Sequence, residues 1–400
     1  MFKSFFFAGF ECATGYNALG EWIDQIAATH HDKHAGEDYA RLREVGIYAA
    51  REAIRWPLVD RGGGKYDFSS VEAFITASRK HEVEVIWDLF HYGYPDDLDL
   101  FSEEFPKRFS DYCYAAARHI SAHSPGTCYF TPVNEPSFFA WAGGHVGRFA
   151  PHCVGKGVEL KRALIRAAIQ GIEAIWSAVP QARMVNVDPL CHVVAPADRP
   201  DLQPDAARFN AQAVFESWDM LCGKIMPDLG GSRKHLDIIG INYYWTNQWE
   251  LGRDERPLAE DDARRVSLSE LVLEVNRRYG GDLLITETAH VDDMRPKWLE
   301  YVADETEILL AQGVPLHGVC LYPILGMPEW HDQTRWTQMG LWELSNCENV
   351  LERVLCEPML QALKKAQRIE RRIKFALGVS KKEDQGASKF SDPRNALSLA

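Results

Sequence analysis

Short runs rich in β-branched and aromatic residues alternate along the chain with longer segments of helical periodicity. This alternation is typical of repeated β–α units that build a parallel sheet. The runs predict eight strands, at Phe5–Phe10, Ile47–Ile54, Val83–Leu89, Tyr129–Val133, Met184–Asp188, Ile238–Tyr243, Leu283–Thr286 and Gly318–Tyr322. Eight strands with intervening helices favour an α/β fold that is a single (β/α)8 TIM barrel. An open doubly wound sheet is disfavoured further because no G-x-G-x-x-G motif follows the first strand.

The segments between the strands place apolar side chains on one helical face. In Gly36–Glu44, for example, Tyr39 and Leu42 fall on the same side before Gly46 ends the helix. The other predicted helices are Val71–Lys80, Glu159–Ser177, Pro204–Cys222, Leu268–Tyr279, Pro296–Gln312 and Asn349–Phe375. No internal domain boundary is evident, so residues 1–376 form the predicted barrel. Residues 377–400 are polar and are expected to be a flexible C-terminal tail.

Composition and charge narrow the possible partners. The 400 residues are 46% hydrophobic and 25% charged, which suits one large globular domain. A net charge of −13 repels phosphate backbones and anionic lipids, so neither nucleic acid nor a membrane is an expected partner. The nine cysteines are scattered without a C-x-x-C pair, and the apolar N-terminal run is too short for a secretory signal. We therefore expect free thiols and a cytoplasmic protein; the oligomeric state is not indicated.

Reactive groups of an α/β barrel lie just past the carboxyl ends of its strands. His91 follows the third predicted strand, Asn134 and Glu135 follow the fourth, and Glu287 ends the seventh, while Arg51 lies on the second. The two glutamates are expected to stand across the mouth of the barrel from each other. Cleavage of a glycosidic bond requires such a pair, one carboxyl group protonated and the other ionised.

A series of motifs falls in a common order along these strands. They are HHDKHAGEDYARLREVG before the second strand, AREAIRWP on it, LFHYGYP after the third, TPVNEP after the fourth, IIGINYYW on the sixth, ITET on the seventh and YPILGMPEW after the eighth. With these motifs the chain resembles glycoside hydrolase family 1, the β-glucosidase and β-galactosidase barrels within the clan of retaining (β/α)8 glycosidases. The resemblance spans roughly residues 5–344.

The resemblance implies a β-glycosidase that acts on gluco- or galacto-type glycosides through a covalent glycosyl–enzyme intermediate. Glu135 would be the general acid/base and Glu287 the nucleophile. The implied substrate-binding residues are Asn134 at the sugar 2-hydroxyl, Arg51 and Tyr244 at the Glu287 carboxylate, His91 at a glycone hydroxyl, Glu329 at hydroxyls farther round the ring, and Trp330 beneath its apolar face. The partner would be a small carbohydrate or glycoside, with no cofactor. The cluster His30, His31 and His34 matches no zinc spacing, so no metal is expected.

Several positions depart from the family pattern. The first-strand motif A-T-x-x-Y-Q is one residue shorter here, which leaves Asn17 or Glu11 to contact the glycone. Tyr322 stands where a tryptophan is usual, and Gly-Met-Pro replaces Asp-Asn-Phe before Glu329. A carboxylate at Glu329 would repel a phosphorylated sugar, which favours an unphosphorylated glycone. These departures alter the part of the site that would recognise the sugar. Two alternatives therefore stay open: a transglycosidase that uses the same intermediate, and a glycan-binding barrel without activity.

Overall fold

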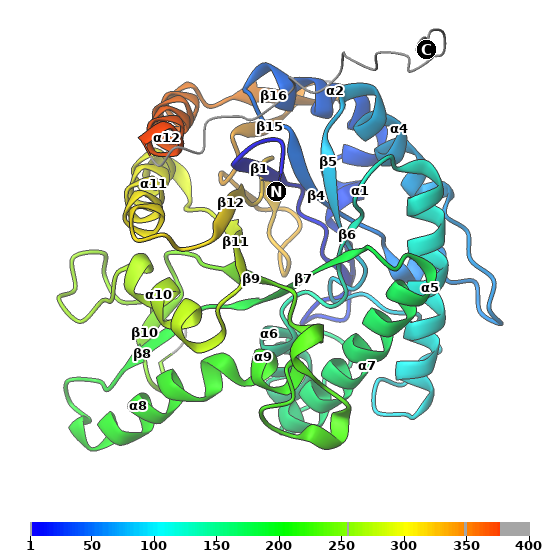
Figure 1. The fold of residues 1–400 in the computed structure, drawn as a ribbon, viewed down its shortest axis with the longest axis horizontal. Coiled ribbons are helices and arrows are strands. Elements are labelled where there is room, and N and C mark those ends of the chain that lie inside the picture. The colour runs from blue at the N-terminus through cyan, green and yellow to red at the C-terminus, as the bar shows by residue number, and fades with distance from the viewer. Residues whose placement is uncertain (1, 254–255, 348–349, 377–400) are drawn as a thin grey trace, which may run out of the picture.

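The computed structural model describes residues 2–253, 256–347 and 350–376. Within them, eight parallel strands close into a barrel (Figure 1). These are β1 (Phe6–Gly9), β4 (Ala49–Ala53), β5 (Glu84–Asp88), β6 (Tyr129–Thr131), β7 (Arg183–Pro189), β9 (Ile238–Asn242), β11 (Asp282–Thr288) and β12 (Leu316–Leu321). Pairing of β1 with both β12 and β4 closes the ring. Each strand overlaps a predicted one, and the predicted (β/α)8 barrel is confirmed.

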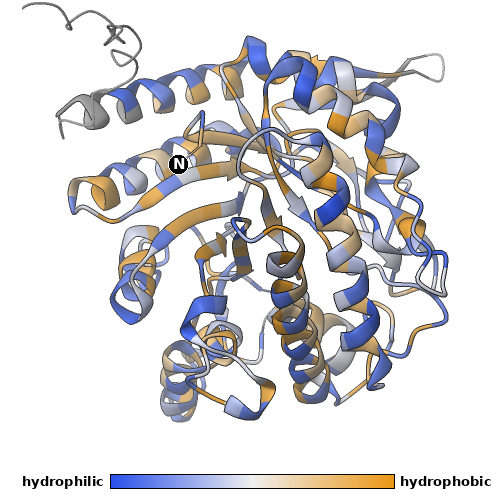
Figure 2. Cartoon of the chain, turned by 45° about the vertical axis from the view of Figure 1, so that its right-hand side comes forward, coloured by the Kyte–Doolittle hydropathy of each residue, from blue (hydrophilic) through white to orange (hydrophobic). Residues whose placement is uncertain are grey.

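Helices surround the barrel and cover the outer face of its strands (Figure 1). The longer ones are α2 (His31–Glu44), α4 (Glu72–His81), α5 (Glu104–His123), α7 (Gly157–Ala178), α8 (Gln203–Ala211), α10 (Leu268–Tyr279), α11 (Arg295–Ala311) and α12 (Glu357–Ala376). Figure 2 shows that the strands are largely hydrophobic while the helices carry both kinds of side chain. In α7 the buried residues recur every three or four positions, at Leu160, Leu164, Ile165, Ala168, Ile169, Ile172 and Ile175. Burial of this apolar face holds the helix against the barrel.

Two helix predictions need correction. The predicted helix 204–222 is interrupted, because α8 ends at Ala211 and a separate helix, α9 (Glu216–Leu221), follows a 3-10 turn. The predicted helix 349–375 starts only at Glu357, because Val350–Leu355 forms strand β16, which pairs antiparallel with β15 (Trp342–Cys347). Pro358 explains the later start, since proline fits the first turn of a helix but would interrupt a longer one. Helix α5 is not among the helices predicted from the sequence.

Short two-stranded sheets lie in the loops that follow the barrel strands. They pair β2 (Thr14–Tyr16) with β3 (Trp22–Asp24), β8 (His192–Val194) with β10 (Gln248–Glu250), and β13 (Met327–Pro328) with β14 (Trp336–Thr337). Because each follows the carboxyl end of a barrel strand, together they build the rim where ligands of such barrels bind. Short helices α1 (Gln25–Ala28), α3 (Trp56–Val59) and α6 (Pro136–Phe139) and the π-helical turn η2 (Ala140–His145) complete it.

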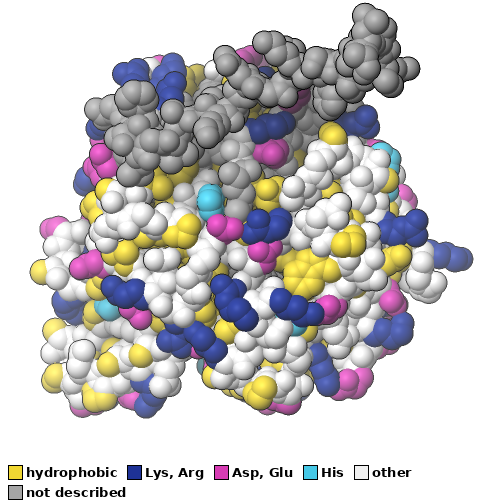
Figure 3. Space-filling view, viewed as in Figure 1, with side chains coloured by type: hydrophobic (Ala, Val, Ile, Leu, Met, Phe, Trp, Pro, Cys, Tyr) yellow, Lys and Arg dark blue, Asp and Glu magenta, His cyan; other side chains and the backbone are white. Residues whose placement is uncertain are grey.

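The remaining predictions concern the chain as a whole. The expected tail, 377–400, lies outside the described residues. Among those that are described, no helix has both the length and the apolar character that a membrane crossing requires. Eight of the nine cysteines belong to the described side chains, and all eight are free thiols. The face seen in Figure 3 mixes basic, acidic and hydrophobic side chains. The cytoplasmic location stays a prediction from the sequence.

Candidate active site

Glu135 and Glu287 both line a cavity of about 810 Å³ at the carboxyl ends of the barrel strands. Glu287 lies on β11, and Glu135 lies between β6 and the short helix α6. Glu135 has a positive φ of 46°, an uncommon conformation for a residue with a side chain. Both side chains are more than nine-tenths buried. The fold therefore brings the two predicted carboxyl groups to one cavity.

The carboxylate of Glu287 is held by donors on both oxygens. Nη1 of Arg51 donates to Oε1 at 2.9 Å, and the hydroxyl of Tyr244 donates to Oε2 at 2.7 Å. The Arg51 guanidinium is fully buried on β4 and also donates to Asp88 at 2.6 Å and to Asn134 at 3.2 Å. These contacts fix the Glu287 side chain in one orientation beside a permanent positive charge.

The surroundings of Glu135 are different. Its Oε2 accepts a hydrogen bond from the Tyr92 hydroxyl at 2.8 Å, and its Oε1 accepts one from Nδ2 of Asn242 at 2.9 Å. Burial and the nearby charge of Glu287 raise the pKa of Glu135 to about 8. Among the described residues, no cation contacts Glu135 to offset burial and the charge of Glu287. Both effects favour the protonated form of Glu135 over the ionised form.

His91 is fixed at one side of the same cavity. Its Nδ1 lies 3.2 Å from the Cys12 thiol and 3.2 Å from Oδ2 of Asp88, and its Nε2 lies 3.2 Å from Nδ2 of Asn134. The ring of Tyr322 stacks parallel to the imidazole with the centroids 6.1 Å apart. These neighbours set the orientation of the imidazole relative to the cavity, which His91 lines.

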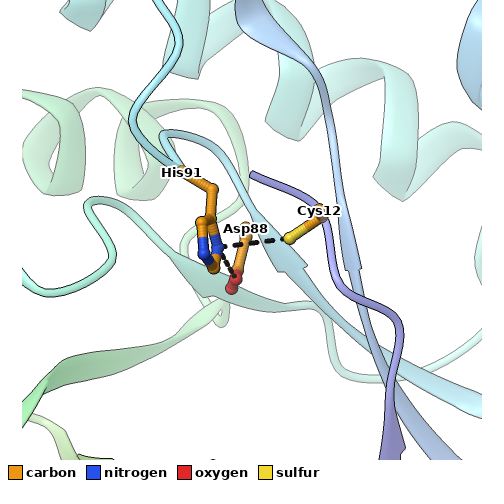
Figure 4. Close-up of side chains that lie close together, drawn as sticks. All are labelled: Cys12, Asp88 and His91. Carbon is orange, nitrogen blue, oxygen red and sulfur yellow. Dashed lines mark hydrogen bonds and ion pairs between the residues drawn. The ribbon is translucent and has the colours of Figure 1, made fainter. Parts of the chain in front are cut away.

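Cys12, Asp88 and His91 deserve comparison with a metal site, because their donor atoms lie within 4.8 Å of one another (Figure 4). However, Asp88 already accepts from the Arg51 guanidinium, and the Cys12 thiol lies 3.2 Å from the Tyr322 hydroxyl. A cation bound here would lie beside a buried guanidinium, which opposes its binding. The cluster is better explained as the hydrogen-bond network that supports His91.

His31, from the histidine motif, is also held by carboxylates. Its two ring nitrogens lie 2.9 Å from Asp38 and 2.8 Å from Glu52. Arg353 of β16 pairs with the same Asp38 at 2.9 Å. This buried ion network ties α2 to β4 and to the C-terminal hairpin, so it has a structural role.

Asn17 and Glu11 are the two residues that the shortened first-strand motif leaves to contact the glycone, and they have different surroundings. Asn17 is fully buried, donates to the backbone oxygen of Trp330 at 3.0 Å and accepts from the amides of Leu19 and Glu21. It shapes the turn between β2 and β3. Glu11 instead lines the cavity together with Trp330.

Glu329 follows β13 and directly precedes Trp330. Among the described residues, the cavity wall contains its neighbour Trp330 but not Glu329. The Glu329 carboxylate lies 3.3 Å from Nε of Arg335. The Trp330 ring packs against the edges of Tyr92 and Phe149, with centroids 5.8 and 5.5 Å away. Trp330 is therefore placed at the cavity, and the contact of Glu329 with sugar hydroxyls stays a prediction.

No family model matches the chain, and no curated protein matches it. Solved structures do match, and among them are structures of a β-glucosidase from Thermotoga maritima. Its complex with noeuromycin is 14% identical with a TM-score of 0.70, covering 92% of this chain and 98% of the other. Its complex with deoxynojirimycin is 15% identical with a TM-score of 0.71, covering 91% and 98%. A structure described as a family 1 β-glucosidase from T. maritima is 15% identical with a TM-score of 0.70. The match covers 91% of this chain and 98% of the other. The chain has the fold of a family 1 β-glucosidase. The resemblance drawn from the motifs is thus confirmed at the level of the fold.

Sequence reasoning missed several residues that contact the two glutamates or line the cavity. Asp88 and Asn242 are the last residues of β5 and β9, so inspection of every strand end would have found them. Tyr92, next to His91, contacts Glu135 only because the backbone turns there, with φ of 74°. The outer wall is largely apolar, with Phe138, Trp141, Phe209, Val214, Trp249 and Leu251.

Proposed function

We propose that this protein is a divergent family 1 glycoside hydrolase that cleaves β-linked gluco- or galacto-type glycosides with retention of anomeric configuration. The observation that carries the proposal is the contrast between two carboxyl groups of one cavity. Glu287 is held by Arg51 and Tyr244, whereas Glu135 has a pKa raised to about 8 by burial and by Glu287. Such a division between nucleophile and acid is what double displacement requires.

In the first step, a carboxylate oxygen of Glu287 forms a bond to the anomeric carbon while the bond to the leaving oxygen breaks. Glu135 transfers its proton to that oxygen. In the second step, water attacks the anomeric carbon, gives its proton to Glu135 and releases Glu287. As the resemblance implies, Asn134 would contact the sugar 2-hydroxyl; Arg51 and His91 hold its amide in place. Trp330 would lie against the apolar face of the sugar ring.

Small carbohydrate ligands suit this cavity. The T. maritima β-glucosidase binds noeuromycin and deoxynojirimycin, which are compact sugar analogues. A cavity of about 810 Å³ is within the usual range for small-molecule sites. The apolar outer wall favours an aromatic or aliphatic leaving group over a second sugar. The same wall would hold an acceptor alcohol away from water, so transglycosylation is the second candidate. Addition of an alcohol acceptor during turnover distinguishes the two through the products formed.

The proposal is tested by rescue of two alanine variants. Glu287→Ala should lose hydrolysis of 4-nitrophenyl β-D-glucoside, and azide should restore turnover with the α-glycosyl azide as product. Glu135→Ala should instead give the β-glycosyl azide with a substrate that has a good leaving group, because azide then attacks the intermediate. Full activity of either variant without azide contradicts the assignment. Sugar binding by the wild-type protein without any hydrolysis would favour a glycan-binding barrel.

A further inference from the structure

The two oxygens of the Glu135 carboxyl group have different neighbours. Nδ2 of Asn242 donates to Oε1 at 2.9 Å, and the Asn242 amide is oriented by the Thr286 hydroxyl, which donates to its Oδ1 at 2.7 Å. Because an amide nitrogen only donates, Oε1 carries no proton in this arrangement. The transferable proton of Glu135 therefore lies on Oε2, which contacts the Tyr92 hydroxyl at 2.8 Å.

The hydroxyl of Tyr92 donates its own proton to Oε2. Its other polar neighbour among the described residues is Nδ2 of Asn134 at 3.5 Å, which only donates, so Glu135 is the acceptor left to the hydroxyl. Burial and the charge of Glu135 raise the pKa of Tyr92 well above its ordinary value, so the hydroxyl keeps its proton. With Tyr92 at one lone pair of Oε2, the proton of Glu135 occupies the other and is directed to the cavity that both residues line.

Tyr92 and Glu135 both have a left-handed backbone conformation, with φ of 74° and 46°. Residues with a side chain rarely adopt it, and it persists only where the surrounding structure maintains it, often at functional sites. The Tyr92 ring also packs against Phe139 and Phe149, with ring centroids 5.5 and 5.6 Å away. The position of the hydroxyl relative to Oε2 is therefore fixed by backbone and ring packing together.

We propose that Tyr92 is a positioning residue for proton transfer, whose hydroxyl directs the proton of Glu135 into the cavity and stabilises the carboxylate that remains after the transfer. This inference rests on the proposed glycosidase function. In the first step, Glu135 gives its proton to the leaving oxygen as the glycosidic bond breaks, and Tyr92 keeps its own. In the second step, water returns a proton to Glu135 while Tyr92 remains the donor to Oε2.

The contribution of Tyr92 depends on the leaving group. A hydrogen bond to an ionised acceptor is stronger than one to a neutral acceptor. A poor leaving group requires that Glu135 has largely given up its proton in the transition state, whereas 2,4-dinitrophenolate leaves with little proton transfer. Tyr92 therefore acts mainly on glycosides of weakly acidic alcohols and phenols.

The test compares Tyr92→Phe with wild type on phenyl and 2,4-dinitrophenyl β-D-glucoside. Phenylalanine keeps the ring and removes only the hydroxyl. We expect kcat/KM to fall by about tenfold or more on the phenyl glucoside and by less than about twofold on the dinitrophenyl glucoside. Tyr112→Phe is the matched control, because the buried Tyr112 hydroxyl contacts only the backbone oxygens of Ile54 and Leu89 among the described residues. Its loss should leave the ratio between the two substrates unchanged.

The pH profile is a readout that a merely structural role would not move. The titratable groups that face Glu135 are Glu287 of β11, Asp188 of β7, and Tyr92, Cys191 and Tyr244 of the loops. Tyr92 donates to the ionised form, so its loss should raise the pKa of Glu135 and move the alkaline decline of kcat/KM on the phenyl glucoside to higher pH. Incorporation of 3-fluorotyrosine in place of Tyr92 retains the contact with a stronger donor and should move the decline to lower pH. NMR titration of the labelled Glu135 carboxyl carbon follows both changes without turnover.

The outcomes separate this inference from the proposed function. If wild type hydrolyses both glucosides but Tyr92→Phe loses activity equally on the two, or matches Tyr112→Phe, the role of Tyr92 is overturned and the glycosidase function stands. A pKa of Glu135 that is unchanged or lower in Tyr92→Phe also overturns that role. If wild type hydrolyses neither glucoside, the proposed function fails and the inference fails with it.

Discussion

The neighbours of each glutamate, rather than the glutamates themselves, distinguish their chemistry. Glu135 transfers a proton only while protonated, and its pKa is raised to about 8 by burial and by Glu287. We therefore expect kcat/KM on a poorly activated glycoside to decline as the pH rises through about 8. In Glu135→Gln, measured on a substrate with a good leaving group, this alkaline decline should disappear. A decline that persists unchanged would assign the proton transfer to another group.

The coupling between the two carboxyl groups is measurable directly. Glu287→Gln removes the negative charge that helps to raise the pKa of Glu135, so that pKa should fall. NMR titration of the protein with labelled glutamate carboxyl carbons follows this change. An unchanged or higher pKa of Glu135 in the variant would mean that the two groups do not interact.

The hydroxyl of Tyr244 donates to the proposed nucleophile at 2.7 Å. Tyr244→Phe leaves the ring in place but removes the donor, and a hydrogen bond to a charged group contributes about 1.5–3 kcal/mol. We expect kcat to fall by about 10- to 100-fold with the melting temperature preserved. Tyr114→Phe, which changes an exposed ring, is the control. Equal rates for the two variants would contradict the role of Tyr244.

At the scale of elements, the sequence predicts the barrel strands well. Most are short runs dominated by apolar residues, such as Ile238–Asn242, which is buried at every position. The start of the terminal helix differs from the prediction because β16 has an apolar pattern that also fits a helix, and only pairing with β15 decides between them. Likewise, strand-end placement locates Glu135 and Glu287, but the directions of Glu11 and Glu329 depend on loop contacts that no local pattern encodes.

The short helix that follows Glu135 depends on a residue of another strand. Asp188, at the end of β7, accepts from the Ser137 amide at 3.0 Å and from its hydroxyl at 2.5 Å. Asp188→Ala removes both acceptors from the first turn of α6, which should cost about 1–2 kcal/mol and displace Glu135. We expect a lower denaturation midpoint and a lower kcat. Asp188→Asn keeps an acceptor for the amide and should lose less; an equally stable Asp188→Ala would contradict this role.

At the scale of the whole molecule, the buried ion network of His31 links stability to pH. Although burial opposes its protonation, Glu52 and Asp38 outweigh that and raise the pKa of His31 from 6.5 to about 9. A histidine whose pKa is raised on folding stabilises the protein fully below its unfolded pKa, and this contribution is lost as pH rises through the folded pKa.

The free energy of unfolding should therefore fall between about pH 6.5 and 9, by as much as about 3 kcal/mol from this group. Urea unfolding at several pH values measures it. In His31→Gln the dependence over this range should be flattened. A slope as steep as that of wild type would show that another group is responsible.

The barrel, its cavity and the paired carboxyl groups together lead to one central claim, retention of configuration by double displacement. NMR of the first sugar released from an aryl β-glucoside, recorded before mutarotation, tests it most directly. The account predicts that the β-anomer appears first. Initial appearance of the α-anomer would mean that water attacks directly, and would contradict the roles given to Glu287 and Glu135.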